Sequence, residues 1–494
     1  MCIRDRLGSV LQILCLVLLI PLIVVAAYWG QKGDGVTTLT AFAIPAVISF
    51  LLGLFLRTKF RLEGLDSAGS MLLCALAWIV ASAVSALPFV IGIGSNYLNA
   101  YFEAMSGFTT TGITVYTGLD DMPRSILFWR SLTQWLGGLG ILSFFLIITF
   151  RGSGFHHIYG AESHKIASTR PTPGLFGTVK ILWAIYAGFT LSAAIAFSIE
   201  GMPVFDSVCH ALTALSTGGF SPHDASIDFY RITSHQNFRL IEYTVTFFMM
   251  LGGINFLIHY RVLTGGFRAL YDNIEIRYWW ALIVGFTVII MVERFYKAGL
   301  FTTSVKPGDI EQTFRYSIFQ VISLLTTTGF GTKDIGADFF GAVARQLFLV
   351  MMVIGGCVGS TGGGLKVLRV AILTRLIRRE LFKITVSEKA TTKIVIDGRI
   401  VPDEEIHRVA ALFFTWVALL LVGGVVTAML SNHGAFQSLS GMFSALGNIG
   451  PCYISVQEMI DINPVVKIVY IFGMLAGRLE ILPVLLLFSG RAWR

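Results

Sequence analysis

Four short segments of the chain repeat one pattern, and each lies between two apolar stretches that are long enough to cross a lipid bilayer. In every copy a small hydroxyl residue stands six positions before a shared glycine, and apolar residues stand four, seven and eight positions before it. The copies recur at intervals of roughly 110 residues, enough chain for two spans and a loop. The pattern predicts four units of span, pore loop and span around one axis. The segments are SGFTTTGIT, TALSTGGFS, SLLTTTGFG and SALGNIGPC, with the shared glycines Gly112, Gly219, Gly329 and Gly450.

The composition excludes a soluble protein of this size. Of the 494 residues, 55% are hydrophobic and only 13% are charged, so we expect an all-α polytopic membrane protein with about ten spans. The first two spans precede the repeats and predict an N-terminal two-helix hairpin over residues 1–66. The four pore repeats are assigned to residues 67–170, 171–275, 276–400 and 401–494. The predicted spans are 8–29, 38–57, 70–92, 126–150, 178–199, 240–263, 278–295, 342–377, 409–430 and 464–489.

Positive charge is concentrated on one side of the predicted spans. If the N-terminus is cytoplasmic, most of the 37 Lys and Arg residues fall in cytoplasmic segments, as the positive-inside rule requires. The pore loops then face outward, where acidic residues would raise the local concentration of cations. An ordinary solvated loop surface is the alternative explanation. The net charge of +8 reflects this inside bias, so we expect a lipid bilayer and no nucleic acid as partner. The acidic residues are Asp120, Asp121, Asp206, Asp224 and Asp228.

The four loops have the composition of an ion filter. A cation that loses its water needs oxygen ligands, and backbone carbonyls that point at an axis supply them without permanent charge. Glycine permits the necessary backbone turn, and threonine or serine hydroxyls can add a further ring of oxygens. Each loop resembles a degenerate T-V-G-Y-G potassium filter, although any single loop could be an ordinary Gly-Thr turn. The fourth loop departs most, with asparagine in place of threonine. The predicted K+-coordinating residues are Thr110, Thr111, Gly112, Thr217, Gly218, Gly219, Thr327, Thr328, Gly329, Asn448, Ile449 and Gly450.

A glycine-rich run interrupts the second span of the third repeat. Residues 355–364 read GGCVGSTGGG, and a regular helix is excluded there because each glycine costs about 1 kcal/mol. Non-helical backbone at membrane depth is tolerated where it is buried in protein or lines a water-filled cavity. We expect an intramembrane loop that acts as a gate under the filter, with an inert kink as the alternative. Lys366, just after the run, is expected to snorkel toward the interface. The predicted gate residues of the run are Gly355, Gly356, Gly359, Ser360, Thr361, Gly362 and Gly363.

Arg478 places a cation inside the last predicted span. The other three repeats have an apolar residue at the aligned position, namely Leu139, Ile254 and Cys357. A charge at membrane depth costs at least about 2.5–3.5 kcal/mol and usually marks a pathway. Glu480 lies two residues away, off the same helical face. We therefore expect Arg478 near the pore below the filter, where it could repel ions or hold the glycine-rich loop. A structural salt bridge is the alternative.

These motifs resemble one known family. The four loops, the segment GGCVGSTGGGLKVLR at 355–369 and the segment MLAGRLEILPVLLLF at 474–488 are similar to those of the Trk/Ktr/HKT potassium transporter superfamily, and in particular of its bacterial TrkH-type pore subunits. The resemblance covers essentially the whole chain. It implies potassium uptake across the bacterial inner membrane, a homodimer, and a TrkA-like cytoplasmic subunit that binds nucleotides and moves the gate. It implies neither an organic cofactor in this chain nor an enzyme activity.

The resemblance also implies roles for individual residues. The 355–364 loop matches the family's intramembrane gating loop, and Arg478 matches the arginine that closes against it. In the plant branch, serine in place of the first filter glycine goes with sodium permeation. Here that position is Gly112, which favours potassium.

Two other classes of function remain open. A sodium-permeable or cation-coupled secondary transporter would need an acidic residue inside the membrane, and Glu103 in the first pore helix is the candidate. A membrane-embedded enzyme would need clustered catalytic side chains that face a cavity. The nine histidines include one adjacent pair, His156-His157.

Overall fold

The structure is a computed structural model that describes residues 2–59, 67–151, 175–297, 307–385, 392–490 and 493. The described chain is helical except for one antiparallel hairpin of β1 (Val395–Ile396) and β2 (Arg399–Ile400). The pair His156-His157 lies outside the described residues. The all-α fold class predicted from the sequence is confirmed.

The chain begins with the predicted helical hairpin. It consists of α1 (Cys2–Leu19), α2 (Pro21–Ala27) and α3 (Val36–Lys59). Helices α1 and α3 cross closely at Gly8 and Gly53, because a Cβ on either glycine would lie 2.8 Å from the backbone oxygen of the other. Ser49 strengthens the crossing by donating its hydroxyl hydrogen to the carbonyl of Leu11 at 2.7 Å. The small residues thus let two largely apolar helices pack along their backbones.

Each of the four repeats contributes a first span, a pore helix that ends in a coil, and a second span. Repeat 1 contains α4 (Ser67–Ser85), α5 (Leu87–Ile93), α6 (Tyr97–Phe108), η1 (Leu119–Asp121) and α7 (Arg124–Arg151). Repeat 2 contains α9 (Leu175–Ile199), α10 (Val204–Leu215), α11 (Asp228–Ile232), α12 (Phe238–Gly253), α13 (Phe256–Leu263) and η3 (Phe267–Leu270). Repeat 3 contains α14 (Ile274–Lys297), α15 (Pro307–Leu325), α16 (Ala342–Val353) and α17 (Val367–Thr385). Repeat 4 contains α18 (Asp403–Leu430), α19 (Ala435–Gly447), α20 (Val456–Asp461), α21 (Pro464–Arg478), α22 (Leu482–Leu485) and η4 (Leu486–Phe488).

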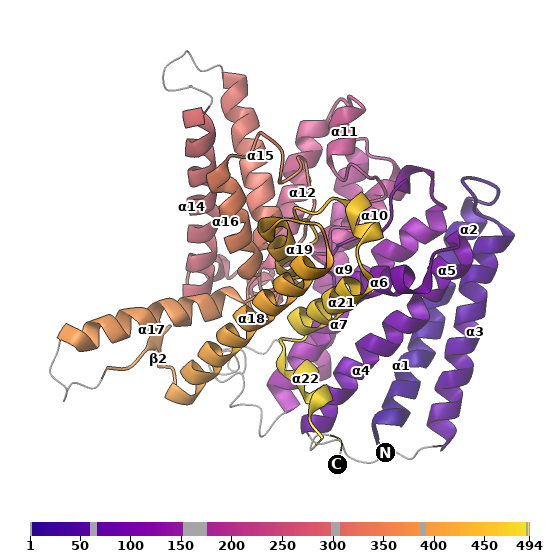
Figure 1. The fold of residues 1–494 in the computed structure, drawn as a ribbon, viewed down its shortest axis with the longest axis horizontal. Coiled ribbons are helices and arrows are strands. Elements are labelled where there is room, and N and C mark those ends of the chain that lie inside the picture. The colour runs from indigo at the N-terminus through magenta and orange to yellow at the C-terminus, as the bar shows by residue number, and fades with distance from the viewer. Residues whose placement is uncertain are drawn as a thin grey trace.

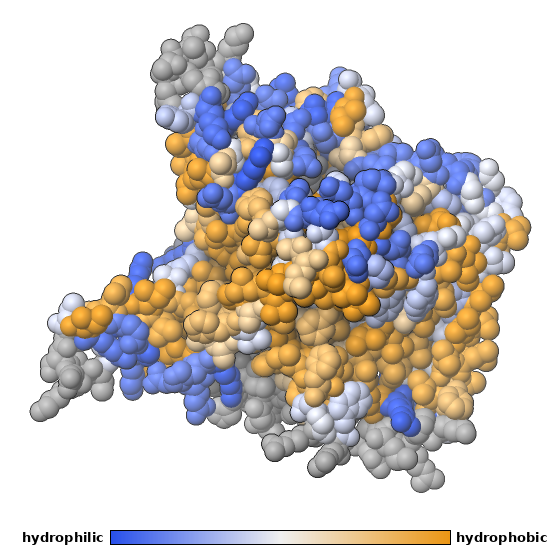
Figure 2. All heavy atoms as spheres, viewed as in Figure 1, coloured by the Kyte–Doolittle hydropathy of each residue, from blue (hydrophilic) through white to orange (hydrophobic). Residues whose placement is uncertain are grey.

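The pore helices α6, α10 and α19 lie toward the middle of the molecule, and the pore helix α15 stands beside α14 and α16 (Figure 1). The N-terminal hairpin forms one flank, helices α14 to α16 form the other, and α17 extends away from the body together with the β-hairpin. Figure 2 shows hydrophobic residues over the middle and lower right of the body, and hydrophilic residues along its upper edge. An apolar belt below a polar rim is the surface expected of a protein embedded in a bilayer.

Several second spans are not continuous helices. Six described helices are long and apolar enough to cross a membrane, and a seventh span results if the bent pair α12 and α13 is counted as one. Residues 240–263 bend by 106° between these helices, residues 342–377 are divided by the expected coil, and helix α21 ends at Arg478. The predicted spans 240–263, 342–377 and 464–489 are therefore interrupted and not continuous helices, and the number of about ten spans stays a prediction. In repeat 2 the cause of the break is Asn255, whose side chain accepts a hydrogen bond from the amide of Leu257 and caps α13.

Polar caps fix where the helices beside the filter begin. Asn96 starts the pore helix α6 by accepting a hydrogen bond from the amide of Leu98 at 2.9 Å. Asn463 starts α21 in the same way, and Pro464 follows it at the first helical position, where a missing amide hydrogen has no cost. The starting points of α6 and α21 are therefore defined by these caps.

Candidate ion filter and intramembrane gate

The four loops that follow the pore helices share one backbone conformation. In every loop the residue two positions before the shared glycine has a positive φ, and so does the glycine itself. A positive φ costs a non-glycine residue of order 1–3 kcal/mol, so its recurrence at one place in four copies marks a conformation that the surrounding structure enforces. The φ values are 50° at Thr110, 54° at Thr217, 59° at Thr327 and 56° at Asn448, and 82° at Gly112, 76° at Gly219, 85° at Gly329 and 103° at Gly450.

The shared glycines close the loops into a ring. Each glycine faces the carbonyl oxygen that precedes the glycine of the next repeat, and there is no room between them for a side chain. A Cβ on Gly112 would lie 2.2 Å from Gly218 O, on Gly219 2.0 Å from Thr328 O, on Gly329 1.9 Å from Ile449 O, and on Gly450 3.1 Å from Thr111 O. Because the fourth contact returns to the first repeat, the four loops surround one axis. We call this set of glycines and carbonyls the filter ring.

A cavity of about 370 Å³ lies against the filter ring and forms its mouth. All four glycines line the cavity, together with the residues that follow them in each loop. Asp224 and Asp228, which the sequence predicts at the mouth, line it, and so does Asp334, which sequence reasoning missed. The mouth therefore carries carboxylates close to the ring, where they favour cations over anions.

His223 joins repeats 1 and 2 at this mouth. Its Nδ1 lies 2.5 Å from a carboxylate oxygen of Asp120, its Nε2 lies 3.0 Å from one of Asp206, and its ring stacks on Phe229 with centroids 3.5 Å apart. Burial lowers the pKa of His223, but the hydrogen bonds to Asp206 and Asp120 outweigh burial, so the pKa is raised above its ordinary 6.5. Asp120 and Asp206 are thus engaged with a histidine, while Asp121 in η1 is exposed to solvent.

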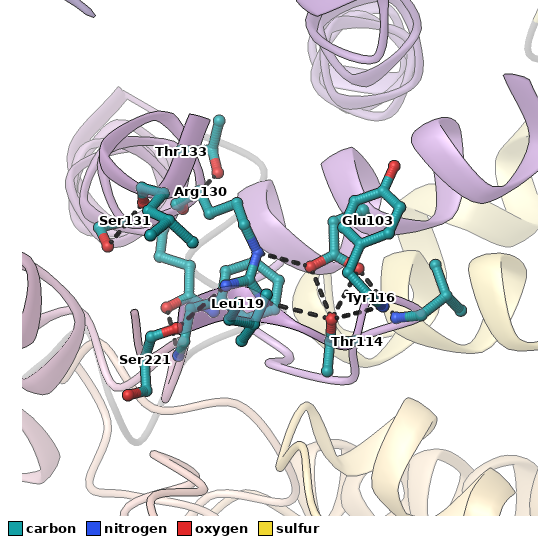
Figure 3. A network of polar contacts seen from close by, with 12 residues as sticks. Glu103, Thr114, Tyr116, Leu119, Arg130, Ser131, Thr133 and Ser221 are labelled. Atoms are coloured by element: carbon teal, nitrogen blue, oxygen red, sulfur yellow. Dashed lines mark hydrogen bonds and ion pairs between the residues drawn. The ribbon is translucent and has the colours of Figure 1, made fainter. Parts of the chain in front are cut away.

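A buried ion pair braces the first two loops (Figure 3). Arg130 on α7 donates from Nε to Glu103 on α6 at 2.8 Å and from Nη1 to the carbonyl of Ser221 at 3.0 Å. Glu103 also accepts hydrogen bonds from the hydroxyl of Thr114 at 2.9 Å and the amide of Val115 at 3.0 Å. Glu103 is fully buried and neutralised by these partners. The residue that a cation-coupled transporter would need as a free intramembrane acid is therefore part of a structural ion pair.

Two further buried carboxylates were missed by sequence reasoning. Glu242 on α12 forms an ion pair with Arg315 on α15, and Glu275 at the start of α14 accepts a hydrogen bond from the amide of Val358 at 2.7 Å. Both acids stand in or beside predicted apolar stretches, which is the signal that could have found them. Glu275 matters for the pathway because its partner belongs to the glycine-rich run.

The glycine-rich run forms the intramembrane loop that the sequence predicts. Residues 355–364, called the gating loop after their predicted role, are non-helical and buried between α16 and α17. The loop folds back on itself so closely that a Cβ on Gly355 would lie 1.8 Å from Gly363 O. At its base the amide of Gly355 donates to the carbonyl of Leu365 at 2.8 Å. The remaining predicted gate residues Gly356, Gly359, Ser360, Thr361 and Gly362 lie in the same buried coil.

The gating loop lies directly against the residues that begin the filter. The amide of Gly363 donates to the hydroxyl of Thr327 at 2.7 Å. The hydroxyl of Thr361 donates to the carbonyl of Leu215, at the end of pore helix α10, and lies 3.4 Å from the hydroxyl of Thr217. Thr217 and Thr327 are both predicted filter residues, so two of the four loops are hydrogen-bonded to the gating loop at the same aligned position. A shift of the loop would therefore change its contacts with Thr217 and Thr327.

Arg478 holds the gating loop from the neighbouring repeat 4. It is 2% exposed, and its Nη1 donates to the carbonyl of Thr361 at 2.6 Å while its Nη2 donates to the carbonyl of Gly137 at 3.0 Å. Among the described residues Arg478 has no ion pair, because Glu480 instead pairs with Arg369 at 2.6 Å. The salt-bridge explanation for Arg478 is therefore wrong. Its charge bridges the gating loop and α7 beneath the filter, as expected of a residue that holds the loop.

The expectation for Lys366 is wrong. Its side chain is only 7% exposed, and its Nζ donates to the carbonyl of Gly362 within the gating loop. The cause is the backward fold of the loop, which presents carbonyl oxygens to the lysine and keeps it from reaching the membrane interface. Lys366 and Arg478 thus both bind the loop through its backbone.

The fourth loop uses its asparagine to bind its neighbours. Asn448 Nδ2 donates to the hydroxyl of Thr111 at 2.9 Å and to the carbonyl of Met474 at 2.9 Å. A threonine hydroxyl has one hydrogen and could not donate to both. Of the four residues at this aligned position, Thr110 alone makes no side-chain hydrogen bond among the described residues, and Asn448 bonds only through its amide nitrogen. The asparagine that replaces threonine in the fourth loop therefore ties this loop to the first loop and to α21.

Comparisons with known proteins agree with this architecture. A family model described as TrkH, cation transport protein, matches residues 39–494. The Trk system potassium uptake protein TrkH of Salmonella typhimurium is 32% identical, with 97% of this chain and 96% of the relative covered. TrkH of Vibrio parahaemolyticus is 31% identical, with 99% and 98% covered. An uncharacterized cation transporter of Methanocaldococcus jannaschii is 30% identical, with 99% and 95% covered.

A solved structure gives the same result in three dimensions. The crystal structure of the potassium transporter TrkH from Vibrio parahaemolyticus superposes with a TM-score of 0.87 at 28% identity, and the match covers 100% of both chains. The fold of the chain has therefore been solved before. On both the family match and the identity of its relatives, the chain belongs to the TrkH family of cation transport proteins.

Proposed function

We propose that the chain takes up potassium across the bacterial inner membrane through a channel-like pore. The observation that carries the proposal is the filter ring, in which four glycines and four carbonyls from four repeats close around one axis. Backbone carbonyls in such a ring replace the water that a monovalent cation loses on entry. Relatives named as potassium uptake proteins along nearly the whole chain support K+ as the transported ion.

The proposal assigns the ion-binding and gating roles as the sequence predicts them. The loop residues from Thr110 to Gly112 and their equivalents in the other repeats bind K+. The gating loop closes the path beneath them, and Arg478 holds it closed through the carbonyl of Thr361. Movement of the loop away from Thr217 and Thr327 would open the path.

The setting of the pore is part of the same proposal. The N-terminus is cytoplasmic, because that orientation places most Lys and Arg residues inside. Opening is controlled by a TrkA-like nucleotide-binding subunit that binds the cytoplasmic face, and two copies of the chain form a homodimer with one pore in each. Relatives that are components of a named Trk system support a regulatory partner. The chain itself transports ions and is not an enzyme.

The sodium-permeable or cation-coupled transporter is the second candidate. Its coupling acid would be Glu103, and the pairing of Glu103 with Arg130 at 2.8 Å speaks against that role. A carboxylate that must bind and release a cation in each cycle needs an accessible, changeable set of partners. Ion selectivity separates the two candidates directly.

The deciding experiment is ion uptake into liposomes that contain the purified chain. Under equal inward gradients we expect K+ and Rb+ to enter, with Na+ and Li+ largely excluded. Empty liposomes give the leak. Liposomes with the Gly329→Ser variant give a protein-containing control with a damaged filter. Equal fluxes of Na+ and K+ through the unmodified chain would overturn the potassium assignment.

A further inference from the structure

One buried amide from repeat 1 is inserted into the filter loop of repeat 2. Gln134 lies on α7 and is 0% exposed. Its Nε2 donates to the carbonyl of Gly218 at 2.6 Å, and its Oε1 accepts from the amide of Phe220 at 3.0 Å. A single side chain thus holds the backbone on both sides of Gly219, one of the four glycines of the filter ring.

The contact explains why repeat 2 departs from the sequence pattern of repeats 1 and 3. Just before the shared glycine those repeats have Thr111 and Thr328, each with its hydroxyl 2.7 Å from that of another threonine two positions earlier. Repeat 2 has Gly218 at this place. A Cβ on Gly218 would lie 2.3 Å from Cδ of Gln134 and 2.4 Å from its Oε1. Gln134 therefore occupies the space that a threonine side chain takes in the other repeats.

The orientation of one filter carbonyl depends on this amide. Gly218 O is a member of the filter ring, where it faces Gly112. Gly218 and Gly219 are consecutive, and two glycines in sequence leave the intervening peptide unusually free to rotate. The hydrogen bond from Gln134 removes that freedom by fixing the direction of the carbonyl. Without it, the oxygen could turn away from the axis and leave an ion with fewer ligands on one side.

We propose that Gln134 is a positioning residue that determines the ion selectivity of the filter. It acts through Gly218, so residues 134 and 218 form a coupled pair that replaces the threonine of the loops in repeats 1 and 3. The proposal rests on the proposed function, since it assumes that ions pass through the filter ring. A buried glutamine with a purely structural role would lower protein stability when lost but would not change which cation the pore prefers.

The test is reciprocal rescue in full-length protein reconstituted in liposomes, with K+, Rb+ and Na+ uptake measured for each variant. We expect Gln134→Ala to conduct K+ but to raise the Na+ to K+ flux ratio about tenfold, the equivalent of one hydrogen bond. Gly218→Thr should lower K+ uptake at least about tenfold, because its side chain meets Gln134. In the double variant Gln134→Ala with Gly218→Thr, the threonine side chain fills the space that Gln134 leaves. This variant should take up more K+ than Gly218→Thr and should be more selective than Gln134→Ala.

Controls separate the possible failures. Ser131→Ala on the same helix removes a buried hydroxyl that donates to the carbonyl of Leu127, and it should leave selectivity unchanged. Gln134→Met keeps the side-chain volume without the hydrogen bonds and should lose selectivity, which keeps the test decisive if Gln134→Ala does not fold. Unchanged selectivity in both Gln134 variants, or a double variant no better than Gly218→Thr, would overturn the inference. A parent chain that does not discriminate K+ from Na+ would instead overturn the proposed function.

Discussion

Repeats 1 and 2 tie the far ends of their filter loops to their own pore helices, whereas repeats 3 and 4 lack this tie and are held through Thr327 and Asn448. The difference is clearest nine positions before the shared glycine. There Glu103 binds Thr114 in repeat 1, and His210 lies 3.1 Å from the hydroxyl of Ser221 in repeat 2. In each case the partner follows the glycine by two positions, so a side chain links the pore helix to the far end of its own loop.

The third and fourth repeats lack this link. Gln320 occupies the same place in repeat 3, but the position two after the glycine is Gly331, and the amide of Gln320 has no hydrogen bond among the described residues. In repeat 4 the place is taken by Gly441, where a Cβ would lie 2.0 Å from the hydroxyl oxygen of Tyr470. These two loops are held instead through Thr327 and Asn448. The far ends of two filter loops are thus fixed to their own pore helices by a side chain at this position, and those of the other two loops are not.

The largest effect is expected from a side chain in the filter ring. Gly329→Ser combines backbone strain at φ 85° with a clash 1.9 Å from Ile449 O, and should reduce K+ uptake by at least about 100-fold. Tracer uptake into liposomes measures the loss. Gly331→Ser is the matched control, because the nearest atom to its Cβ is 3.5 Å away, and it should retain uptake. Full activity of Gly329→Ser would contradict the closed ring.

Breaking the brace of repeat 1 should be the next largest effect. Glu103→Gln leaves Arg130 buried without its carboxylate and should lower the free energy of unfolding by about 3–5 kcal/mol. Thermal unfolding of the purified protein measures it. Gln320→Leu at the aligned position should change stability by less than about 1 kcal/mol, since the amide it removes makes no hydrogen bond within the described chain. If Glu103→Gln and Gln320→Leu lowered the free energy of unfolding equally, the proposed difference between repeats 1 and 3 would be wrong.

Releasing the gating loop should increase flux. Arg478→Ala removes the hydrogen bonds to Thr361 and Gly137, and K+ flux without any cytoplasmic partner should rise about tenfold. Liposome flux at matched protein density measures the change. Lys467→Ala, on the same helix but bonded to Asn99 and Ile460, is the control and should not raise flux. An unchanged flux for Arg478→Ala would count against the proposed gate.

The contact between repeats 1 and 2 at the mouth should depend on pH. The pKa of His223 is raised in the folded state, so its stabilisation is fully present below the ordinary value of 6.5 and is lost as pH rises through the raised pKa. Above that pH the neutral ring can donate to only one of Asp120 and Asp206. The unfolding midpoint should therefore fall by a few degrees on the alkaline side, and His223→Gln should flatten this step. A step of the same size in both proteins would assign it to another group.

The smallest expected effect is a gain. Gly331→Ser supplies repeat 3 with the hydroxyl that Thr114 and Ser221 supply in repeats 1 and 2, and Gln320 is placed to bind it. One added hydrogen bond should raise the unfolding midpoint by about 1–2 °C. The double variant Gly331→Ser with Gln320→Leu should lose the gain. If the gain persisted without Gln320, the new hydroxyl would have found a different partner.

The sequence predicted the parts of the molecule that are repeated or compositionally extreme. Four aligned glycines were sufficient to place the filter loops, and the density of glycine in 355–364 was sufficient to place a non-helical loop inside the membrane. Arg478 was identified by the same logic, since three repeats have an apolar residue where the fourth has a cation. Comparison of the four repeats with one another thus gave the information that an alignment of relatives usually gives.

The braces could not be predicted, because they depend on which helices meet. Glu103 and Arg130 lie in different helices, and Gln134 reaches a loop of another repeat. Arg130 and Gln134 both stand inside a predicted span, which was a signal of a buried polar role, but the partner of each is fixed only by the fold. The bend after Gly253 was missed for a similar reason. The capping role of Asn255 becomes visible only in the broken helix.

The filter ring also bears on how the four repeats could have diverged. Each shared glycine accommodates the carbonyl of the following repeat, so its identity is constrained by a neighbouring copy as well as by its own. The residue just before the glycine contributes only its backbone oxygen to the ring, and here the copies differ, with Thr111, Gly218, Thr328 and Ile449. After duplication of an ancestral unit, the shared glycine could change in one copy only together with the copy that packs against it. The residue just before the glycine could change in each copy separately.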